Sequence, residues 1–331
     1  MASLIEIARA ARVSIATVSR VINESGVVKE RTRLRVRRAM ERLDYRPNRV
    51  ARRLRQRSGR RQLLGVIIPE IENPHFSEIV RGIEDAAYER KFAVMLCNSD
   101  DDPAKEGFYL DVLRGESVDG VIVPPIHERD PALLAAAAAG LPVVVIDRRL
   151  ENPAVDSVVV DNRQGTRLAV GHLLARGHRE IAVIAGPQQN NTMRDRLEAW
   201  ADTLAANGLA APSEFIRWGD NRQESGVACA EALLSLAKRP RAIFVCNNLM
   251  AAGALEAIHR LGLSVPGDIA IVGFDDPPWA QALSPSLTTV RQPTREMGRL
   301  AVSLLLRRID EPLSPPRNVV LAPELMVRDS S

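Results

Sequence analysis

Two kinds of hydrophobic pattern divide this chain of 331 residues, and the change falls near residue 62. Before that point, apolar side chains recur every three or four positions, as on the buried face of an amphipathic helix. After it, short apolar runs rich in β-branched residues alternate with amphipathic segments. The sequence therefore predicts a small all-α domain followed by a larger α/β domain.

Three helices are predicted in the first part of the chain. A capping box beginning at Ser3 starts the first, and Ser14 caps the second, whose Val18 and Val21 face inward. The third spans 30–43, and its apolar side comprises Leu34, Val36, Ala39, Met40 and Leu43. Two short helices around a tight turn, braced by a third, indicate a helix-turn-helix whose second helix fits the major groove. A small bundle with a solvated arginine-rich face fits the same pattern.

The second part of the chain alternates strands with helices. The predicted strands are 64–68, 93–96, 120–123, 143–146, 158–160, 181–184, 242–245 and 269–272. Uninterrupted apolar strands between helices are typical of parallel sheets that are covered on both faces. About ten strands in this length favour two doubly wound parallel-sheet subdomains rather than one.

Composition excludes several classes of protein. The longest apolar stretch, 133–146, contains Gly140 and Pro142 and is too short and broken to cross a bilayer. The N-terminus lacks a basic region followed by an apolar core, so no secretory signal is expected. Three scattered cysteines argue against a disulfide framework. We therefore expect a cytoplasmic protein that has no contact with membranes.

Charge is distributed unevenly along the chain. Residues 1–61 hold 18 lysines and arginines against 5 acidic residues, whereas the remaining residues hold 27 against 36. This asymmetry favours a basic module for a polyanion such as nucleic acid, joined to an ordinary soluble domain. A basic surface tail would explain the charge equally well.

Two motifs decide between these alternatives. Residues 13–23 read VSIATVSRVIN and resemble the V-S-x-x-T-V-S-R-x-x-N signature of LacI/GalR-family repressors. Residues 43–54 read LDYRPNRVARRL and resemble the Y-x-P-N-x-x-A-x-x-L hinge segment of that family. Both motifs occur in the family's order and spacing, and the similarity continues along the whole chain. The resemblance implies a helix-turn-helix head and a core like the periplasmic ribose-type sugar-binding proteins.

The resemblance implies which head residues contact double-stranded operator DNA. Ile15, Ala16 and Arg20 lie where the family's recognition helix meets base edges. Arg20 can donate twice to guanine, and the two apolar residues can touch thymine methyls. Thr17, Ser19 and Asn23 are suited to phosphate oxygens, although local hydrogen bonds within the helix would also explain Thr17 and Ser19.

A second DNA-binding segment is implied at residues 48–56, which resemble the family's hinge helix. Asn48 belongs to the hinge motif and is expected to contact DNA. There Ala51 allows close approach to the minor groove, and Leu54 wedges between base steps and kinks the duplex. Without the family pattern, Leu54 would be an exposed linker residue.

Arg12 departs from the family, which often has glycine at this corner of the helix-turn-helix. If the position requires a left-handed backbone, arginine costs about 1 kcal/mol relative to glycine. Alternatively the turn differs slightly and Arg12 adds a phosphate contact.

Polar residues follow several predicted strands, at the edge of the sheet where ligands of open parallel sheets bind. The resemblance implies that they form an effector cleft, and the effector-binding residues are His75, Phe76, Asp147, Arg148, Asn190, Thr192, Arg196, Asn221, Asn247, Asp275 and Gln292. Carboxylates, amides and guanidinium groups match the hydroxyls of a sugar, and Phe76 would stack on the ring. Taken singly, Asp275 could equally cap a helix and Asn247 could form a turn.

Two departures from the family bear on the ligand, and a third bears on a structural interaction. His75 replaces the first aromatic residue of the family's stacking pair, which weakens the match to ribose. Asn190 stands where the purine-binding members have an arginine, which argues against a purine. Asn248 replaces a common aspartate, so a structural interaction there is expected to differ.

No catalytic or nucleotide-binding motif was found, so we expect neither enzyme activity, nor a cofactor, nor a metal site. A sugar kinase would need a phosphate-binding loop and a base, and an exported sugar-binding protein would have a signal and no basic head. The chain is expected to be a homodimeric transcriptional repressor that binds palindromic operators. The DNA affinity of this repressor is expected to respond to a small sugar, preferably a monosaccharide. A nucleobase, nucleoside or sugar phosphate is the alternative effector.

The expected domain boundaries follow the same resemblance. Residues 1–46 form the helix-turn-helix domain, 47–61 the hinge helix and linker, and 62–331 the effector-binding and dimerisation core. The N-subdomain of this core is expected at 62–161 and 291–320, and the C-subdomain at 162–290 and 321–331.

Overall fold

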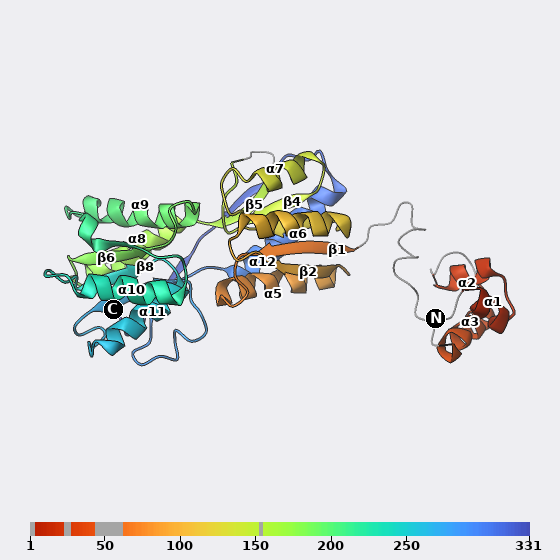
Figure 1. Ribbon diagram of the computed structural model, residues 1–331, viewed down its shortest axis with the longest axis horizontal. Helices are drawn as coiled ribbons and strands as arrows, with labels where there is room; N and C mark the ends of the chain where they lie inside the picture. The colour runs from red at the N-terminus through yellow and green to blue at the C-terminus, as the bar shows by residue number, and fades with distance from the viewer. Residues whose placement is uncertain (1–3, 23–27, 44–61, 152–154) are drawn as a thin grey trace. The chain divides into compact units, whose positions relative to one another are not determined.

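The computed structural model describes residues 4–22, 28–43, 62–151 and 155–331 (Figure 1). The chain divides into two compact units, Met1–Arg61 and Gln62–Ser331, and each is considered by itself. The predicted capping residue Ser3 and the predicted DNA contacts Asn23, Asn48, Ala51 and Leu54 lie outside the described residues.

The first unit contains α1 (Leu4–Ala11), α2 (Ile15–Ile22) and α3 (Glu30–Arg42), close to the predicted helices. Their core consists of Ile7, Ala8, Ala11, Val18, Val21, Val36 and Ala39. One prediction is wrong: Leu34 was expected on the buried side of α3 but is 47% exposed. The reason is that α3 covers α1 and α2 along a narrow stripe, and Val36 and Ala39 already fill it.

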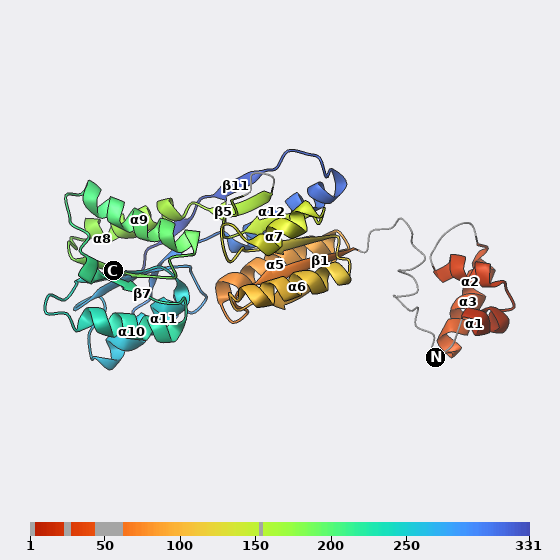
Figure 2. The same cartoon turned by 45° about the horizontal axis from the view of Figure 1, so that its top comes forward.

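The second unit contains two six-stranded sheets, and each forms the centre of a lobe. The first lobe has the strand order β11-β5-β4-β3-β1-β2, and all neighbouring strands are parallel. Its strands are β1 (Leu63–Ile68), β2 (Ala93–Asn98), β3 (Gly120–Val123), β4 (Val143–Ile146), β5 (Asp156–Val160) and β11 (Asn318–Leu321). Figure 2 shows β11, from near the C-terminus, beside β5.

Helices cover both faces of the first sheet. Side chains of α5 (Pro74–Glu89) and α12 (Thr294–Asp310) join one core cluster with alternate residues of β1. Side chains of α6 (Pro103–Gly115) and α7 (Pro131–Ala138) join a second cluster on the other face. Burial on both faces explains why these strands read as continuous apolar runs.

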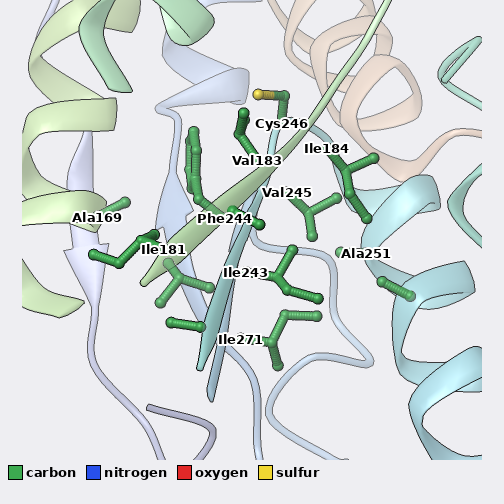
Figure 3. Close-up of a cluster of buried hydrophobic side chains, with 14 of the residues drawn as sticks. Ala169, Ile181, Val183, Ile184, Ile243, Phe244, Val245, Cys246, Ala251 and Ile271 are labelled. Atoms are coloured by element: carbon green, nitrogen blue, oxygen red, sulfur yellow. The ribbon is translucent and has the colours of Figure 1, made fainter. Parts of the chain in front are cut away.

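The second lobe has the strand order β12-β10-β9-β8-β6-β7. Its strands are β6 (Ile181–Ala185), β7 (Ile216–Trp218), β8 (Ala242–Val245), β9 (Ala270–Phe274), β10 (Thr288–Arg291) and β12 (Glu324–Met326). Its helices are α8 (Asn162–Ala175), α9 (Asn191–Ala206), the short η1 (Ser213–Phe215), α10 (Gln223–Leu234) and α11 (Asn248–Arg260). Apolar side chains of β6, β8 and β9 pack against α8 and α11 (Figure 3).

The sheets differ from the predicted pattern at their edges. β12 pairs antiparallel with β10, so the second sheet is not purely parallel. β7, β11 and β12 are short and partly exposed, and they were not among the predicted strands. The chain crosses between the lobes after β5, after β10 and between β11 and β12. Within the described part of the chain, no helix is long and apolar enough to cross a membrane.

Candidate functional site

One face of α2 is exposed in the first unit. Ile15 is 46% exposed, and Ala16 and Arg20 are exposed as well, while Val18 and Val21 anchor the opposite face in the core. On such a surface the isoleucine can make an apolar contact with a base, and the arginine can donate two hydrogen bonds to a base edge. The three residues expected to meet base edges are therefore accessible together.

The hydroxyl of Thr17 is engaged locally. Ser14 accepts a hydrogen bond from the backbone N–H of Thr17 at 3.1 Å, as a helix cap does. The two hydroxyl oxygens, Ser14 Oγ and Thr17 Oγ1, lie 2.9 Å apart. Local hydrogen bonding was the alternative to a phosphate contact at Thr17, and it accounts for this side chain's position.

The corner between α1 and α2 has the left-handed backbone that Arg12 was suspected to adopt, with φ of 50°. Arg35 of α3 braces this corner: its guanidinium donates to the carbonyl oxygen of Ala11 at 2.7 Å and to that of Arg12 at 2.9 Å. These hydrogen bonds also satisfy carbonyl groups at the end of α1. The third helix thus holds a turn that glycine would adopt without strain.

A polar cavity lies between the two lobes of the second unit. It comprises about 640 Å³ of empty space, part of it open to solvent. All the predicted effector residues line it, together with Pro69, Glu70, Asn73, Asp100, Asp101, Met193, Asp220 and Arg222. Small-molecule sites are concave and carry a few polar groups that converge on the ligand, as this cavity does.

The lining is built from strand ends and helix starts. Asn190 caps α9 by accepting from Thr192 N at 2.9 Å, and Asn247 caps α11 by accepting from Met250 N at 2.8 Å. Asn247 also donates to the carbonyl of Asn221 at 3.0 Å. Asp275, by contrast, caps no helix among the described residues, and its carboxylate accepts from Gln292 Nε2 at 2.6 Å. Asp275 therefore does not act as the helix cap considered for it, and Asn247, considered as a turn residue, caps α11.

Three residues of the cavity lining have a strained backbone conformation. Asp147, Asn221 and Asp275 follow β4, β7 and β9, and all have left-handed φ values, of 66°, 71° and 71°. Such conformations cost about 1 kcal/mol or more for residues other than glycine, and they cluster at functional sites. In each case the turn directs a polar residue to the cavity wall.

His75 is held between the two lobes. It is 6% exposed, and its Nε2 donates to Asp147 Oδ1 of the first lobe at 2.9 Å. Its Nδ1 lies 3.5 Å from Asp275 Oδ1 of the second lobe. An imidazole between two carboxylates is stabilised as the imidazolium cation.

The pKa values of this group agree with the geometry. Burial lowers the pKa of His75, but the negative charge of Asp275 and the hydrogen bond to Asp147 outweigh burial and raise it above 6.5. Burial raises the pKa of Asp147, yet the hydrogen bond from His75 and its positive charge hold that pKa below its usual value. The pair therefore favours a charged imidazolium and a charged carboxylate.

The two buried arginines of the cavity are also engaged. Arg148, 4% exposed, makes a bidentate ion pair with Asp101 at 2.6 and 3.1 Å. Arg196 donates to Asn162 and to the carbonyl of Cys246, and its guanidinium stacks 3.5 Å from the ring of Phe274. Both side chains are thus fixed in place before any ligand arrives.

The lobes also touch through amides. Asn248 Nδ2 donates to Asn73 Oδ1 at 2.9 Å, and Asn73 Oδ1 in turn accepts from the N–H of His75 as the cap of α5. An aspartate at position 248 would have no donor for this contact. The departure at Asn248 therefore has a structural role across the cavity.

Sequence reasoning missed several lining residues. Asp101 precedes Asp102, the cap of α6, but its carboxylate pairs with Arg148 instead of the helix. Glu70, Asp100 and Asp220 follow β1, β2 and β7. The rule that ligands sit beyond strand ends, applied to every strand, would have found them.

The chain matches two family descriptions. Residues 3–48 match bacterial regulatory proteins of the lacI family, and residues 170–331 match a periplasmic binding protein-like domain. Among curated relatives, the HTH-type transcriptional repressor PurR of Photobacterium profundum is 33% identical over 331 residues, 100% of this chain and 98% of the relative. The same repressor of Proteus mirabilis is 35% identical over 332 residues, 100% and 97%.

Solved structures agree with these relatives. The lac repressor dimer bound to operator and the anti-inducer ONPF has a TM-score of 0.88 at 32% identity, covering 99% of this chain and 98% of that chain. A complex of the transcriptional regulator CelR with cellobiose has a TM-score of 0.76 at 35% identity, covering 100% of both chains.

Proposed function

This chain belongs to the lacI family of bacterial regulatory proteins and is a DNA-binding transcriptional repressor rather than an enzyme, and from this premise we propose that a small sugar bound between its two lobes controls its affinity for operator DNA. The observation that carries the proposal is the cavity, in which polar side chains of both lobes converge. A ligand held by both lobes stabilises one arrangement of them over the other, and only such differential binding can change DNA affinity.

The lining supports a sugar because it offers acceptors and donors side by side. Asp147 and Asp275 would accept from hydroxyls, while Arg148, Arg196 and Gln292 would donate. Asn190 Oδ1 is used in capping α9, which leaves its amide N–H groups to donate. The short side chains of Thr192 and Asn221 would add further hydrogen bonds to the sugar. Asn247 fixes the loop of Asn221 by donating to its backbone carbonyl.

A nucleobase is supported less well. Phe76 is the one phenylalanine, tyrosine or tryptophan among the described residues that line the cavity. A flat purine needs aromatic surface on its faces, whereas a sugar ring needs one apolar patch and many polar partners. The CelR relative was solved with cellobiose, so a disaccharide is a reasonable size to test beside monosaccharides.

The head is proposed to read operator DNA through α2. Arg20 would donate to guanine, Ile15 and Ala16 would contact thymine methyls, and Ser19 would contact phosphate. The same proposal keeps Asn23, Asn48, Ala51 and Leu54 as DNA contacts. A protein with this function would act in the cytoplasm, where the chromosome lies.

We propose a homodimer because apolar surface is exposed on both lobes. On the second lobe, Leu255, Trp279 and Leu283 line one groove. On the first lobe, Tyr88 of α5 is 76% exposed on one side of the sheet, and Phe108 of α6 is 63% exposed on the other. Exposed apolar patches of this kind mark protein interfaces, and two-fold pairing would match a palindromic operator. Closure of the lobes would then alter the spacing of the two heads.

Fluorescence anisotropy of a fragment from the gene's own promoter tests the proposal. Ribose, glucose, cellobiose and the nucleobases are titrated in turn, and a sugar is expected to change the apparent Kd for DNA. If only a nucleobase does so, or nothing does, the sugar proposal is wrong.

The variant Asp275→Ala provides the matched test. It should abolish the response to the sugar and leave DNA binding without sugar within about 3-fold, because Asp275 lies in the cavity of the second unit. Asp111→Ala, an exposed carboxylate outside the cavity, serves as the control and should keep the response. An unchanged sugar titration for Asp275→Ala would remove this residue from the site.

A further inference from the structure

The cavity has a definite charge distribution. Its carboxylates are Glu70, Asp100, Asp101, Asp147, Asp220 and Asp275, and its guanidinium groups are Arg148, Arg196 and Arg222. His75 is the remaining titratable group among the described lining residues. The distribution has two layers, because some of these side chains are buried in the floor and others are exposed at the mouth.

The floor is electrically balanced when His75 carries its proton. His75, Arg148 and Arg196 supply three positive charges. Asp147 and Asp275 supply two negative charges, and Asp101, whose side chain is 40% exposed, supplies the third from the edge of the floor through its ion pair with Arg148. Burial of an unbalanced charge is costly, so this balance favours a ligand that adds no charge of its own.

The positively charged side chains of the floor already have interaction partners within the protein. The guanidinium of Arg148 faces both oxygens of Asp101, and that of Arg196 is fixed by Asn162, Cys246 and the ring of Phe274. His75 lies between Asp147 and Asp275. A phosphate or carboxylate on a ligand is bound tightly when free guanidinium or ammonium groups face it. An anion that approached Arg148 or His75 would have to break an existing ion pair, whereas Arg196 has uncharged partners and its charge is balanced only by the floor as a whole.

The mouth has an excess of carboxylates, because Glu70, Asp100 and Asp220 line it beside the single exposed guanidinium of Arg222. Glu70 and Asp220 accept hydrogen bonds from backbone N–H groups of their own loops, and neither has an ion pair among the described residues. Asp100 pairs with Lys105, and hydrogen bonding to Lys105 and the charge of Arg222 lower the pKa of Asp100. An anion entering the cavity therefore passes carboxylates from both lobes.

We propose that the effector carries no negative charge: the cavity selects an uncharged sugar over its phosphorylated or carboxylated derivatives, and His75 is the residue that makes the floor neutral. This inference rests on the sugar-binding function proposed above and narrows it. The inference predicts an uncharged sugar and not a sugar phosphate as the effector. The polar character of the lining alone does not distinguish these two ligands.

Isothermal titration calorimetry with matched ligands tests the proposal on the full chain. The pairs are ribose with ribose 5-phosphate, glucose with glucose 6-phosphate, glucose with glucuronate, and cellobiose with cellobiose 6′-phosphate. The uncharged member of any pair that binds should do so at least about 10-fold more tightly. An anionic member that binds equally or better would overturn the inference and leave a sugar effector standing. If no member binds, the proposed sugar function itself fails, and the inference falls with it.

Two variants test which charges set the preference. In Glu70→Lys/Asp220→Lys the mouth loses its acidic character, and the ratio of anionic to uncharged affinity should rise at least about 10-fold, with less effect at high salt. The control replaces one exposed carboxylate per lobe outside the cavity, Asp111→Lys/Glu231→Lys, and should keep the wild-type ratio. An unchanged ratio in the mouth variant would contradict the role of the mouth.

His75→Gln tests the floor, because glutamine keeps a donor but carries no charge. Asp147 and Asp275 then lack their cation, so glucosamine should gain at least about 10-fold relative to glucose. His178→Gln, outside the cavity, should leave this ratio at the wild-type value. An unchanged ratio in a folded His75→Gln protein would show that His75 does not neutralise the floor. If that variant does not fold, the mouth variant still decides the charge proposal.

Discussion

Arg12 holds a backbone conformation that costs about 1 kcal/mol in any residue with a side chain, and the chain compensates with Arg35. The two backbone carbonyls that Arg35 binds lie at the end of α1, where no further helical N–H is available. A residue on α3 thus allows a non-glycine residue at the corner of the helix-turn-helix. Local sequence alone left the geometry of this corner open.

Arg12→Gly should stabilise the head by about 1 kcal/mol, because glycine adopts positive φ without a steric penalty. Amide hydrogen exchange in the full chain measures this, and the protected amides of α1 and α2 should exchange about 5-fold more slowly. Arg35→Ala is the opposite control and should speed exchange. Equal or faster exchange in Arg12→Gly would mean that the turn is not strained.

Arg20→Ala should weaken binding to the specific operator by about 1–3 kcal/mol and leave binding to random DNA nearly unchanged, because a base-edge contact is lost. Anisotropy with the promoter fragment and a scrambled fragment of equal length gives both numbers. Arg31→Ala, on the exposed surface of α3, should affect the two fragments equally if it affects either. Equal losses on both fragments for Arg20→Ala would exclude a base-reading role.

At the scale of elements, α6 carries a buried carboxyl that the proposed function does not use. Glu106 is 1% exposed, and neither of its oxygens has a hydrogen-bond partner among the described residues. Burial, with the nearby carboxylate of Asp130, raises the pKa of Glu106 to about 9. The helix therefore packs on the sheet with this side chain protonated at neutral pH.

The pH dependence of stability follows from that shift. In the unfolded chain Glu106 ionises above about pH 4.5, whereas in the folded chain it keeps its proton to about pH 9. The folded state binds more protons in this window, so the free energy of unfolding decreases as pH rises. Compared with Glu106→Gln, the wild type should lose up to about 1 kcal/mol per pH unit between pH 5 and 9.

Urea unfolding of both proteins at pH 6, 7 and 8 measures the difference. Glu89→Gln, an exposed position on α5, controls for the general effect of removing a carboxylate and should parallel the wild type. Parallel pH profiles for wild type and Glu106→Gln would show that Glu106 titrates normally in the folded chain.

For the whole molecule, the two lobes of the core are coupled by few polar contacts around the cavity. Asn73 and Asn248 meet there, His75 faces Asp275, and Arg149 pairs with Asp195 at 2.7 Å. Each contact joins residues that are far apart in the chain. Such contacts set the balance between lobe arrangements, which a bound effector would shift.

Asn248→Asp should weaken effector binding about 5-fold, because a carboxylate cannot donate to Asn73 Oδ1 and would repel it. Calorimetry with the sugar identified in the anisotropy screen measures the loss. Asn73→Asp keeps an acceptor at both of its hydrogen bonds and should bind the sugar almost as the wild type does. Wild-type affinity in Asn248→Asp would show that this contact does not couple the lobes.

The sequence by itself determined the helices of the head, the central strands and eleven of the residues that line the cavity. It could do so because hydrophobic periodicity reports local structure, and because strand ends of parallel sheets share one edge. The polar residues after β4 and β9 were identifiable for that reason.

Only the tertiary structure decided which of these side chains meet. His75, Asp147 and Asp275 come from distant parts of the chain, and no local pattern indicates that one imidazole lies between two carboxylates of different lobes. The same holds for Asp101 with Arg148 and for the exposure of Leu34. Periodicity specifies which face of an element is buried, but the partners across a cavity depend on how separately formed layers pack together, and that information is spread over the whole chain.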